Sequence, residues 1–181
     1  MSRRGQQSEE WLILVDEKDN ALGYDTRENC HLGEGRMHRA FVVFLFNSKK
    51  ELLVQKRSSQ KLLWPSYWDV SATSHVLRDE EYLSAAARAL KNELGITSAR
   101  LRRVLDFTYV APFGKYSENE YCVLLVDDYD GSVNPNQDEV AAIRYNSLED
   151  LRRDMRAKPD DYTPWFKIAV HRFSLIPTTS R

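Results

Sequence analysis

Apolar residues recur along the chain in short runs separated by polar turns, a pattern typical of β-strands. The strongest run, residues 40–46, is β-branched or aromatic almost throughout, so we expect a buried strand there. Residues 52–56 follow a polar turn and are expected to return as its hairpin partner. Weaker patterns predict further strands at 11–15, 22–27, 67–72, 107–110, 116–126 and 140–145, with a glycine-containing loop over 29–38.

Three segments place apolar residues three or four positions apart, which predicts helices. The first is expected to begin at Asp79, a good N-cap followed by two glutamates, and to stop at Gly95. The second begins after Ser147, and the third after Thr163, where Pro164 takes the favoured first position. The apolar face of the first helix is expected to consist of Leu83, Ala86, Ala87, Leu90 and Leu94.

The order of these elements predicts an α/β (α+β) fold. Helices do not alternate regularly with strands, which argues against a doubly wound parallel sheet and favours a curved mixed β-sheet between helices. The length of 181 residues is that of one domain. We expect a polar N-terminal tail over 1–9, a single domain over 10–175 and a C-terminal tail over 176–181.

Composition excludes several classes of protein. The formal net charge of −1 argues against general nucleic-acid binding, which usually needs a basic excess. No apolar run approaches the ~18 residues of a membrane span, and the first ten residues lack the apolar core of a signal peptide. The two cysteines, Cys30 and Cys122, make no disulfide framework, so we expect a reducing, cytoplasmic setting. Nothing in the sequence decides between a monomer and a homodimer.

Histidines and glutamates are the first candidates for chemistry. His31, His38 and His75 fall in or beside predicted loops and strand starts, and Glu118 and Glu120 share one face of a predicted strand. Three imidazoles and two carboxylates would suit a divalent metal such as Mg, Mn, Fe or Zn. The alternative is that loop histidines and strand glutamates are simply solvated.

Basic side chains near the predicted hairpin suggest a phosphate site. Arg57 and Lys61 are four residues apart, and together with Arg27 they could clamp a diphosphate. A solvated, charged loop is the competing interpretation. Trp165, in the first turn of the last helix, is either a core residue or a ring that faces a cation.

A series of motifs then resembles one enzyme family. N-C-H and H-R-A-F, L-L-V-Q-K-R, W-P-S-Y-W, S-H, E-L-G-I, E-N-E and T-P-W-F-K-I occur in the order seen in type I isopentenyl-diphosphate isomerases, which have the Nudix fold. The resemblance covers roughly residues 10–175. It implies isomerisation of isopentenyl diphosphate to dimethylallyl diphosphate, with a prenyl diphosphate as the small-molecule partner.

The resemblance also implies roles for individual residues. His31, His38, His75, Glu118 and Glu120 correspond to the family's site for a divalent metal, here Mg, Mn or Zn. Glu93 corresponds to a ligand for a Mg ion that accompanies the substrate diphosphate. Arg27, Arg57 and Lys61 match diphosphate-binding positions. Glu120 and Tyr109 match the acid–base pair, and Trp165 matches the ring that faces the carbocation.

One departure from the family concerns catalysis directly. Where the family has a catalytic cysteine, two residues before His75, this chain has Thr73. A thiol titrates near ~8.5, whereas a threonine hydroxyl is a far weaker acid. Loss of a positioned acid–base group typically costs about 10²–10⁴ in rate, so we expect isomerisation to be impaired or altered. A water held by Thr73, or the thiol of Cys122, are the candidates to take its place.

The segment that follows Thr73 bears on hydrolysis, the reaction of most Nudix enzymes. Their motif reads G-x5-E-x7-R-E-U-x-E-E-x-G-U, where U is aliphatic, and its spacing is kept here from Ser74 to Ile96. Two of its metal-binding glutamates are replaced, however, by Ala89 and Asn92. A diphosphate hydrolase with a non-standard carboxylate set is therefore the first alternative. A module that binds a diphosphate without turnover is the second.

Overall fold

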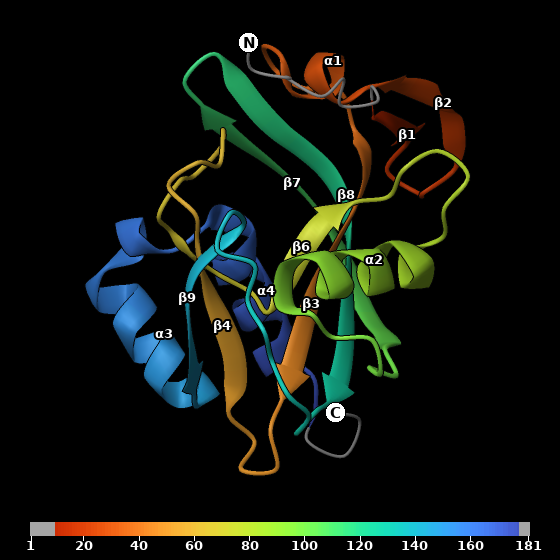
Figure 1. Ribbon diagram of the computed structural model, residues 1–181. Coiled ribbons are helices and arrows are strands. Elements are labelled where there is room, and N and C mark those ends of the chain that lie inside the picture. Colours follow the sequence, from red (N-terminus) through yellow and green to blue (C-terminus); the bar gives the residue numbers. More distant parts are fainter. Residues whose placement is uncertain (1–9, 178–181) are drawn as a thin grey trace, which may run out of the picture.

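The computed structural model describes residues 10–177, so the expected N-terminal tail over 1–9 and residues 178–181 of the expected C-terminal tail lie outside it (Figure 1). In chain order the elements are β1 (Trp11–Val15), β2 (Ala21–Thr26), α1 (Arg27–His31), β3 (His38–Phe46), β4 (Leu52–Arg57), β5 (Trp68–Asp69), β6 (Ala72–His75), α2 (Tyr82–Leu94), β7 (Arg102–Phe113), β8 (Tyr116–Asp128), β9 (Val140–Asn146), α3 (Leu148–Ala157), a 3₁₀ turn at Pro159–Asp161 and α4 (Pro164–Ser174).

Strand β3 lies at the centre of a mixed sheet. It runs antiparallel to β6, with Ala40 opposite His75, and parallel to β8, with His38 opposite Glu120. The strand is fully apolar from Ala40 to Phe46, and each of these residues is buried, as expected for a strand covered on both faces. Its position places the start of β3 beside the end of β6 and the first half of β8.

Strands β7 and β8 form a long, curved antiparallel hairpin that closes one side of the sheet (Figure 1). Its register puts Tyr109 opposite Glu120 and Ala111 opposite Glu118. On the other side, β4 pairs with β5 and β9. The sheet is therefore mixed and curved, as the sequence predicts.

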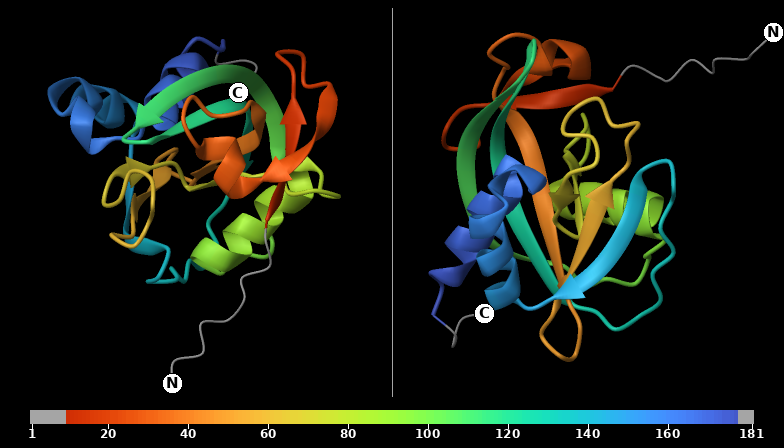
Figure 2. Two further views of the ribbon diagram at one scale, coloured as in Figure 1. Left: turned by 90° about the horizontal axis from the view of Figure 1, so that it is seen from above. Right: turned by 90° about the vertical axis from the view of Figure 1, so that its left-hand side faces the viewer.

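Helices cover both faces of the strands, with α2 on one side and α4 on the other (Figure 2). Alternate residues of β3 divide between the two cores: Phe41, Val43 and Leu45 pack with the buried face of α2. Val42 and Phe44 pack instead with α3 and α4. This confirms the expected arrangement of a curved mixed sheet between helices.

Several predicted boundaries were wrong. Helix α2 begins at Tyr82 with Glu81 as its N-cap, because Asp79 has a φ of +67° and belongs to the preceding turn. Leu83, expected on the buried face, is 52% exposed. The expected strand over 67–72 is divided into β5 and β6. The short helix α1 occupies the end of the expected strand over 22–27 and the start of the expected loop over 29–38, and Thr26 caps it by accepting a hydrogen bond from the Asn29 backbone N–H.

Three other helix ends agree with the sequence. Gly95 ends α2 in the left-handed conformation, at a φ of +67°, and Ser147 caps α3 through a hydrogen bond from the Asp150 backbone N–H. Pro164 is the first residue of α4. No helix within residues 10–177 is long and apolar enough to cross a membrane.

Candidate active site

A pocket of about 460 Å³ opens between the β7–β8 hairpin, the C-terminal half of α2 and the loop that follows β4. Basic, acidic and aromatic side chains line it together. The pocket-lining residues that the sequence singles out are Arg27, His31, Arg57, Lys61, Thr73, His75, Glu93, Tyr109, Glu118, Glu120 and Trp165. The pocket therefore collects all but one of the residues that the resemblance implies. The exception, His38, is fully buried beneath it.

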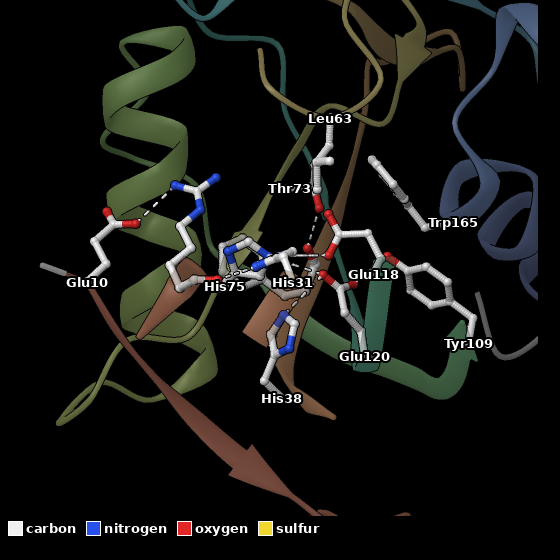
Figure 3. A network of polar contacts seen from close by, with 12 residues as sticks. Glu10, His31, His38, Leu63, Thr73, His75, Tyr109, Glu118, Glu120 and Trp165 are labelled. Carbon is white, nitrogen blue, oxygen red and sulfur yellow. Dashed lines mark hydrogen bonds and ion pairs between the residues drawn. The ribbon is translucent and has the colours of Figure 1, made fainter. Parts of the chain in front are cut away.

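Three imidazole rings meet at the floor of this pocket (Figure 3). His31 ends α1, His38 begins β3 and His75 ends β6, so each ring is held by a different element. The three ring centroids lie 4.8–4.9 Å apart, and none of the three residues is more than 7% exposed. Solvated loop histidines would be scattered and exposed, so that alternative is wrong for these three.

Hydrogen bonds to the main chain fix the orientation of two of the rings. His31 Nδ1 donates to the Arg27 carbonyl oxygen at 2.6 Å, and His38 Nδ1 donates to the Arg36 carbonyl oxygen at 2.7 Å. This turns both Nε2 atoms inward, where His31 Nε2 lies 3.2 Å from His75 Nε2. Such second contacts commonly set the tautomer of a metal-binding histidine.

Two carboxylates from β8 complete the cluster. Glu118 and Glu120 point to the same face, as the strand period of two requires, and each is at most 6% exposed. Glu118 Oε2 lies 2.9 Å from His31 Nε2, and Glu120 Oε1 lies 3.3 Å from His75 Nε2. The cluster therefore contains three nitrogen and two carboxylate groups around one small volume.

The pKa values in this cluster follow from burial and from mutual charge. Burial lowers the pKa of His38 to about 3 and that of His75 to about 4, so both rings are neutral at physiological pH. Burial also raises the pKa of Glu120 well above its usual range, helped by the charge of Glu118. For Glu118 the neighbouring His31 and His75 rings outweigh burial and lower the pKa well below its usual range. Neutral imidazoles beside an ionised carboxylate are the protonation states that metal binding needs.

The polar atoms themselves test whether a metal ion fits. His38 Nε2 is buried and has no hydrogen-bond partner among the described residues, and Glu118 Oε2, also buried, has only its ion pairs with His31 and His75. One ligand atom from each of His31, His38, His75 and Glu118 lies within 4.8 Å of the others. A buried polar atom without a partner is costly, and a divalent cation among these ligand atoms would give His38 Nε2 one. The residues present therefore fit a divalent metal ion.

Glu93 lies in the same pocket but is not one of these four residues. It is 7% exposed in the last turn of α2 and accepts a hydrogen bond from Gln55 Nε2 at 2.7 Å. Burial raises its pKa to about 7, against the opposing charges of Lys61 and Arg57. Near neutral pH such a carboxyl group is therefore protonated in part of the molecules, and a cation that approaches it favours the ionised form.

The three basic residues line the pocket in different states. The Arg57 side chain is 12% exposed and forms an ion pair with the buried Asp69. The Arg27 side chain is 56% exposed and pairs with Glu10 at 3.0 Å. Lys61 pairs with Glu139, which also lines the pocket. The interpretation of a fully solvated charged loop is wrong for Arg57.

Tyr109 and Trp165 lie on the far side of the carboxylates from the imidazole rings, and Thr73 lies beside the carboxylates (Figure 3). Tyr109 donates its hydroxyl proton to Glu120 Oε2 at 2.5 Å. Thr73 donates its own to the Phe41 carbonyl oxygen at 2.8 Å. Trp165 is 3% exposed but still lines the pocket, so it is at once a core residue and a wall of the site.

Cys122, considered as a substitute for the missing thiol, lies on the same face of β8 as Glu120. It is fully buried and packs in the core that faces α3 and α4. Burial raises the pKa of its thiol well above the usual range. It is not among the residues that line the pocket, so it is placed as a packing residue.

Two polar residues of the site were not identified from the sequence. Gln55 holds Glu93, and Asp69 accepts hydrogen bonds from Arg57 and from the indole of Trp165. A signal was present for Asp69, because a carboxylate between Trp68 and Val70 in an apolar segment needs a cation or several donors. Its partners, however, are up to 96 residues away in the chain.

Comparison with known proteins adds three findings on sequence. A family model described as the NUDIX domain matches residues 36–166. Isopentenyl-diphosphate Delta-isomerase I of Camptotheca acuminata is 42% identical over 91% of this chain and 81% of its own length. The chloroplastic isomerase I of Arabidopsis thaliana is 41% identical over 91% of this chain, which spans about 65% of that relative's length.

Comparison of structures gives the same fold at lower identity. A crystal structure from Deinococcus radiodurans matches with a TM-score of 0.75 and 24% identity, over 90% of this chain and 98% of its own. A MutT protein from Methanosarcina mazei matches with a TM-score of 0.62 and 18% identity, over 76% of this chain and 93% of its own. At these identities the matches establish the Nudix fold and nothing further.

The metal cluster makes a first prediction. A His31→Ala variant should lose divalent-metal affinity at least ~10–100-fold, because changes in groups that merely support a ligand already cost that much. The matched control is His171→Ala, which removes the fourth histidine of the chain, an exposed residue on α4. Metal content after dialysis against limiting Mn²⁺ or Zn²⁺ measures both. Equal metal content in the two variants would contradict a histidine site.

Proposed function

Because the chain belongs to the type I isopentenyl-diphosphate isomerase family of Nudix-fold proteins, we propose that it isomerises isopentenyl diphosphate to dimethylallyl diphosphate in a metal-dependent reaction. One observation carries the proposal beyond the family likeness. The buried cluster of His31, His38, His75 and Glu118 lies at the floor of a pocket that is also lined by basic residues and by Trp165. A short prenyl diphosphate has the matching parts, namely a charged end and a small hydrocarbon end.

The two ends of the substrate are assigned by charge. A divalent ion (Mg, Mn or Zn) at the histidine cluster would supply the positive charge that holds Glu118 and Glu120 in place. A Mg ion that enters with the diphosphate is assigned to Glu93, and Arg27, Arg57 and Lys61 to the phosphate oxygens. The hydrocarbon end is then assigned to the space between Glu120 and Trp165.

Isomerisation adds a proton to one carbon of the substrate and removes a proton from another. Glu120, hydrogen-bonded to Tyr109, is assigned the proton that goes to the terminal alkene carbon. The tertiary cation formed at the branched carbon would lie against the Trp165 ring, whose π face attracts a cation and offers no nucleophile. Loss of a proton from the carbon nearer the diphosphate then gives the allylic product.

Thr73 is the weak point of this assignment. It lines the pocket, and its hydroxyl proton is already donated to the Phe41 carbonyl oxygen. The group on the second face has to accept the proton that the substrate loses, and a threonine hydroxyl that keeps its own proton in a sheet contact is a very weak base. We therefore expect turnover to be slow, with a water at Thr73 as the group that serves the second face of the alkene.

The alternatives differ in their products. Hydrolysis of a nucleoside or prenyl diphosphate needs several carboxylates to hold metals and activate water. On α2 the pocket offers Glu93 together with Ala89 and Asn92, while Glu80 is occupied by an ion pair with Arg88. A module that binds a diphosphate without turnover would release no product at all. Phosphate release separates the first alternative from isomerisation.

Some expectations about the whole protein stay predictions. The partner is expected to be a small-molecule prenyl diphosphate, and the assembly is expected to be a monomer or a homodimer. A reducing, cytoplasmic compartment fits the two free, buried cysteines. The relatives include proteins described as chloroplastic.

The isomerase proposal is tested in deuterated water. Metal-loaded protein incubated with isopentenyl diphosphate should place deuterium on carbon and form dimethylallyl diphosphate, because each proton transfer exchanges with solvent. Nuclear magnetic resonance measures both, because the two diphosphates are isomers of equal mass, and a Glu120→Gln variant should show neither label nor product. Absence of label in the substrate and product after long incubation would contradict isomerisation. Release of phosphate or pyrophosphate instead would favour the hydrolase.

Restoring the missing thiol gives a second prediction. A Thr73→Cys variant should isomerise faster by about 10²–10⁴, the usual contribution of a positioned acid–base group. Thr73→Ser is the matched control, since it keeps a hydroxyl and should remain slow. Initial rates under saturating substrate measure the effect. If Thr73→Cys is no faster than Thr73→Ser, the second face of the alkene is not served from this position.

A further inference from the structure

Asp69 is a fully buried carboxylate that the assignments above leave without a role. Its side chain has no solvent exposure, and it ends the two-residue strand β5, opposite Gln55 of β4. Its Oδ1 accepts three hydrogen bonds and its Oδ2 accepts one, and three of these four donors lie at least twelve residues away in the chain. A buried charge with this many partners normally has a structural or a functional reason.

One oxygen of Asp69 fixes the indole of Trp165. Asp69 Oδ1 accepts the indole Nε1–H at 2.7 Å, the Thr163 hydroxyl at 3.0 Å and the Val70 backbone N–H at 2.8 Å. The carboxylate therefore lies at the N–H edge of the ring. The ring faces meet the Arg57 guanidinium, aromatic neighbours and the pocket, with Tyr109 at a centroid distance of 6.2 Å.

The other oxygen fixes Arg57. Asp69 Oδ2 accepts from Arg57 Nη1 at 3.0 Å, while Arg57 Nε and Nη2 donate to the carbonyl oxygens of Trp64 and Leu63. The same guanidinium lies over the Trp165 ring, with its central carbon 5.4 Å from the ring centroid. Asp69 thus joins a residue assigned to the diphosphate with the residue assigned to the hydrocarbon.

This arrangement has an electrostatic consequence. A positive charge that develops beside the Trp165 ring is near the Arg57 guanidinium, which by itself would repel it. The Asp69 carboxylate neutralises that guanidinium through a charge-assisted hydrogen bond. It also accepts the indole N–H, which makes the π face a better partner for a cation. In a dry site these interactions are worth more than in water.

We propose that Asp69 is a positioning residue that makes the Trp165 side of the pocket selective for a cationic hydrocarbon end. It does so by holding the indole at its N–H edge and by cancelling the charge of Arg57. The inference rests on the proposed function, because it takes the carbocation of that reaction as the species the ring meets.

The test compares two diphosphates with the same branched skeleton. Isopentyl diphosphate is uncharged at the branch, and dimethylaminoethyl diphosphate carries a protonated nitrogen there. Selectivity for a cation at the branch is measured by the dissociation constant of isopentyl diphosphate divided by that of dimethylaminoethyl diphosphate. Any change in diphosphate affinity through Arg57 affects both ligands equally and leaves this ratio unchanged. Asp69→Asn should lower this ratio at least tenfold relative to the unaltered protein.

The matched control is Asp19→Asn. Asp19 likewise accepts from an arginine and from an aromatic side chain, Arg39 Nε at 2.7 Å and the Tyr82 hydroxyl at 3.0 Å. Neither of these partners lines the pocket, whereas the arginine and the tryptophan that Asp69 binds both do. This variant should leave the ratio unchanged. If Asp69→Asn leaves it unchanged as well, Asp69 is a purely structural residue and the proposal is wrong.

A second variant keeps the proposal testable if Asp69→Asn does not fold. Trp165→Phe retains an aromatic face and the Asp69 carboxylate but removes the N–H that joins them, so the ratio should fall here too. An unchanged ratio would overturn the link. Failure of the unaltered protein to prefer the cationic ligand would overturn it as well. Preference for that ligand without deuterium incorporation would contradict the isomerase activity alone.

Discussion

The site depends on one electrostatic constraint, the burial of two carboxylates against three imidazoles. Glu118 and Glu120 are almost inaccessible to solvent and lie within 3.3 Å of histidine nitrogens. Placing such charge in the interior is strongly unfavourable unless a cation shares the space. A proton on His31 can meet part of this need, since Glu118 raises the pKa of that ring against the effect of burial. A divalent ion would meet it more fully, because it would also give the buried His38 Nε2 a partner.

The fold builds this cluster from segments that are far apart in the chain. His38 lies at the start of the central strand β3, and the neighbouring strands β6 and β8 bring His75 and Glu120 beside it. The register of β7 with β8 then adds Tyr109 opposite Glu120. Because each of these side chains is carried by a hydrogen-bonded element, their positions do not depend on a bound ion. The pocket above them is built on the same strands.

Much of this was readable in the sequence, for identifiable reasons. The period of two places Glu118 and Glu120 on one face of a strand, and the apolar run of β3 marks the centre of the sheet. The convergence of the three histidines could not be predicted from their spacing, which is equally compatible with solvated side chains. Only the family motifs favoured a common site. The start of α2 was misplaced because Asp79, a good N-cap by composition, has a left-handed backbone conformation. The role of Asp69 was missed because it depends on contacts with Arg57 and Trp165 that no local sequence pattern indicates.

The central claim is that the three imidazoles and Glu118 share a single ion. Anomalous diffraction from crystals of the protein loaded with Mn²⁺ tests it most directly, because the signal locates the metal itself. The account predicts one strong peak between the rings of His31, His38 and His75, at bonding distance from their Nε2 atoms and from a Glu118 oxygen. A peak found only at Glu93, or none within the ring cluster at saturating Mn²⁺, would contradict it.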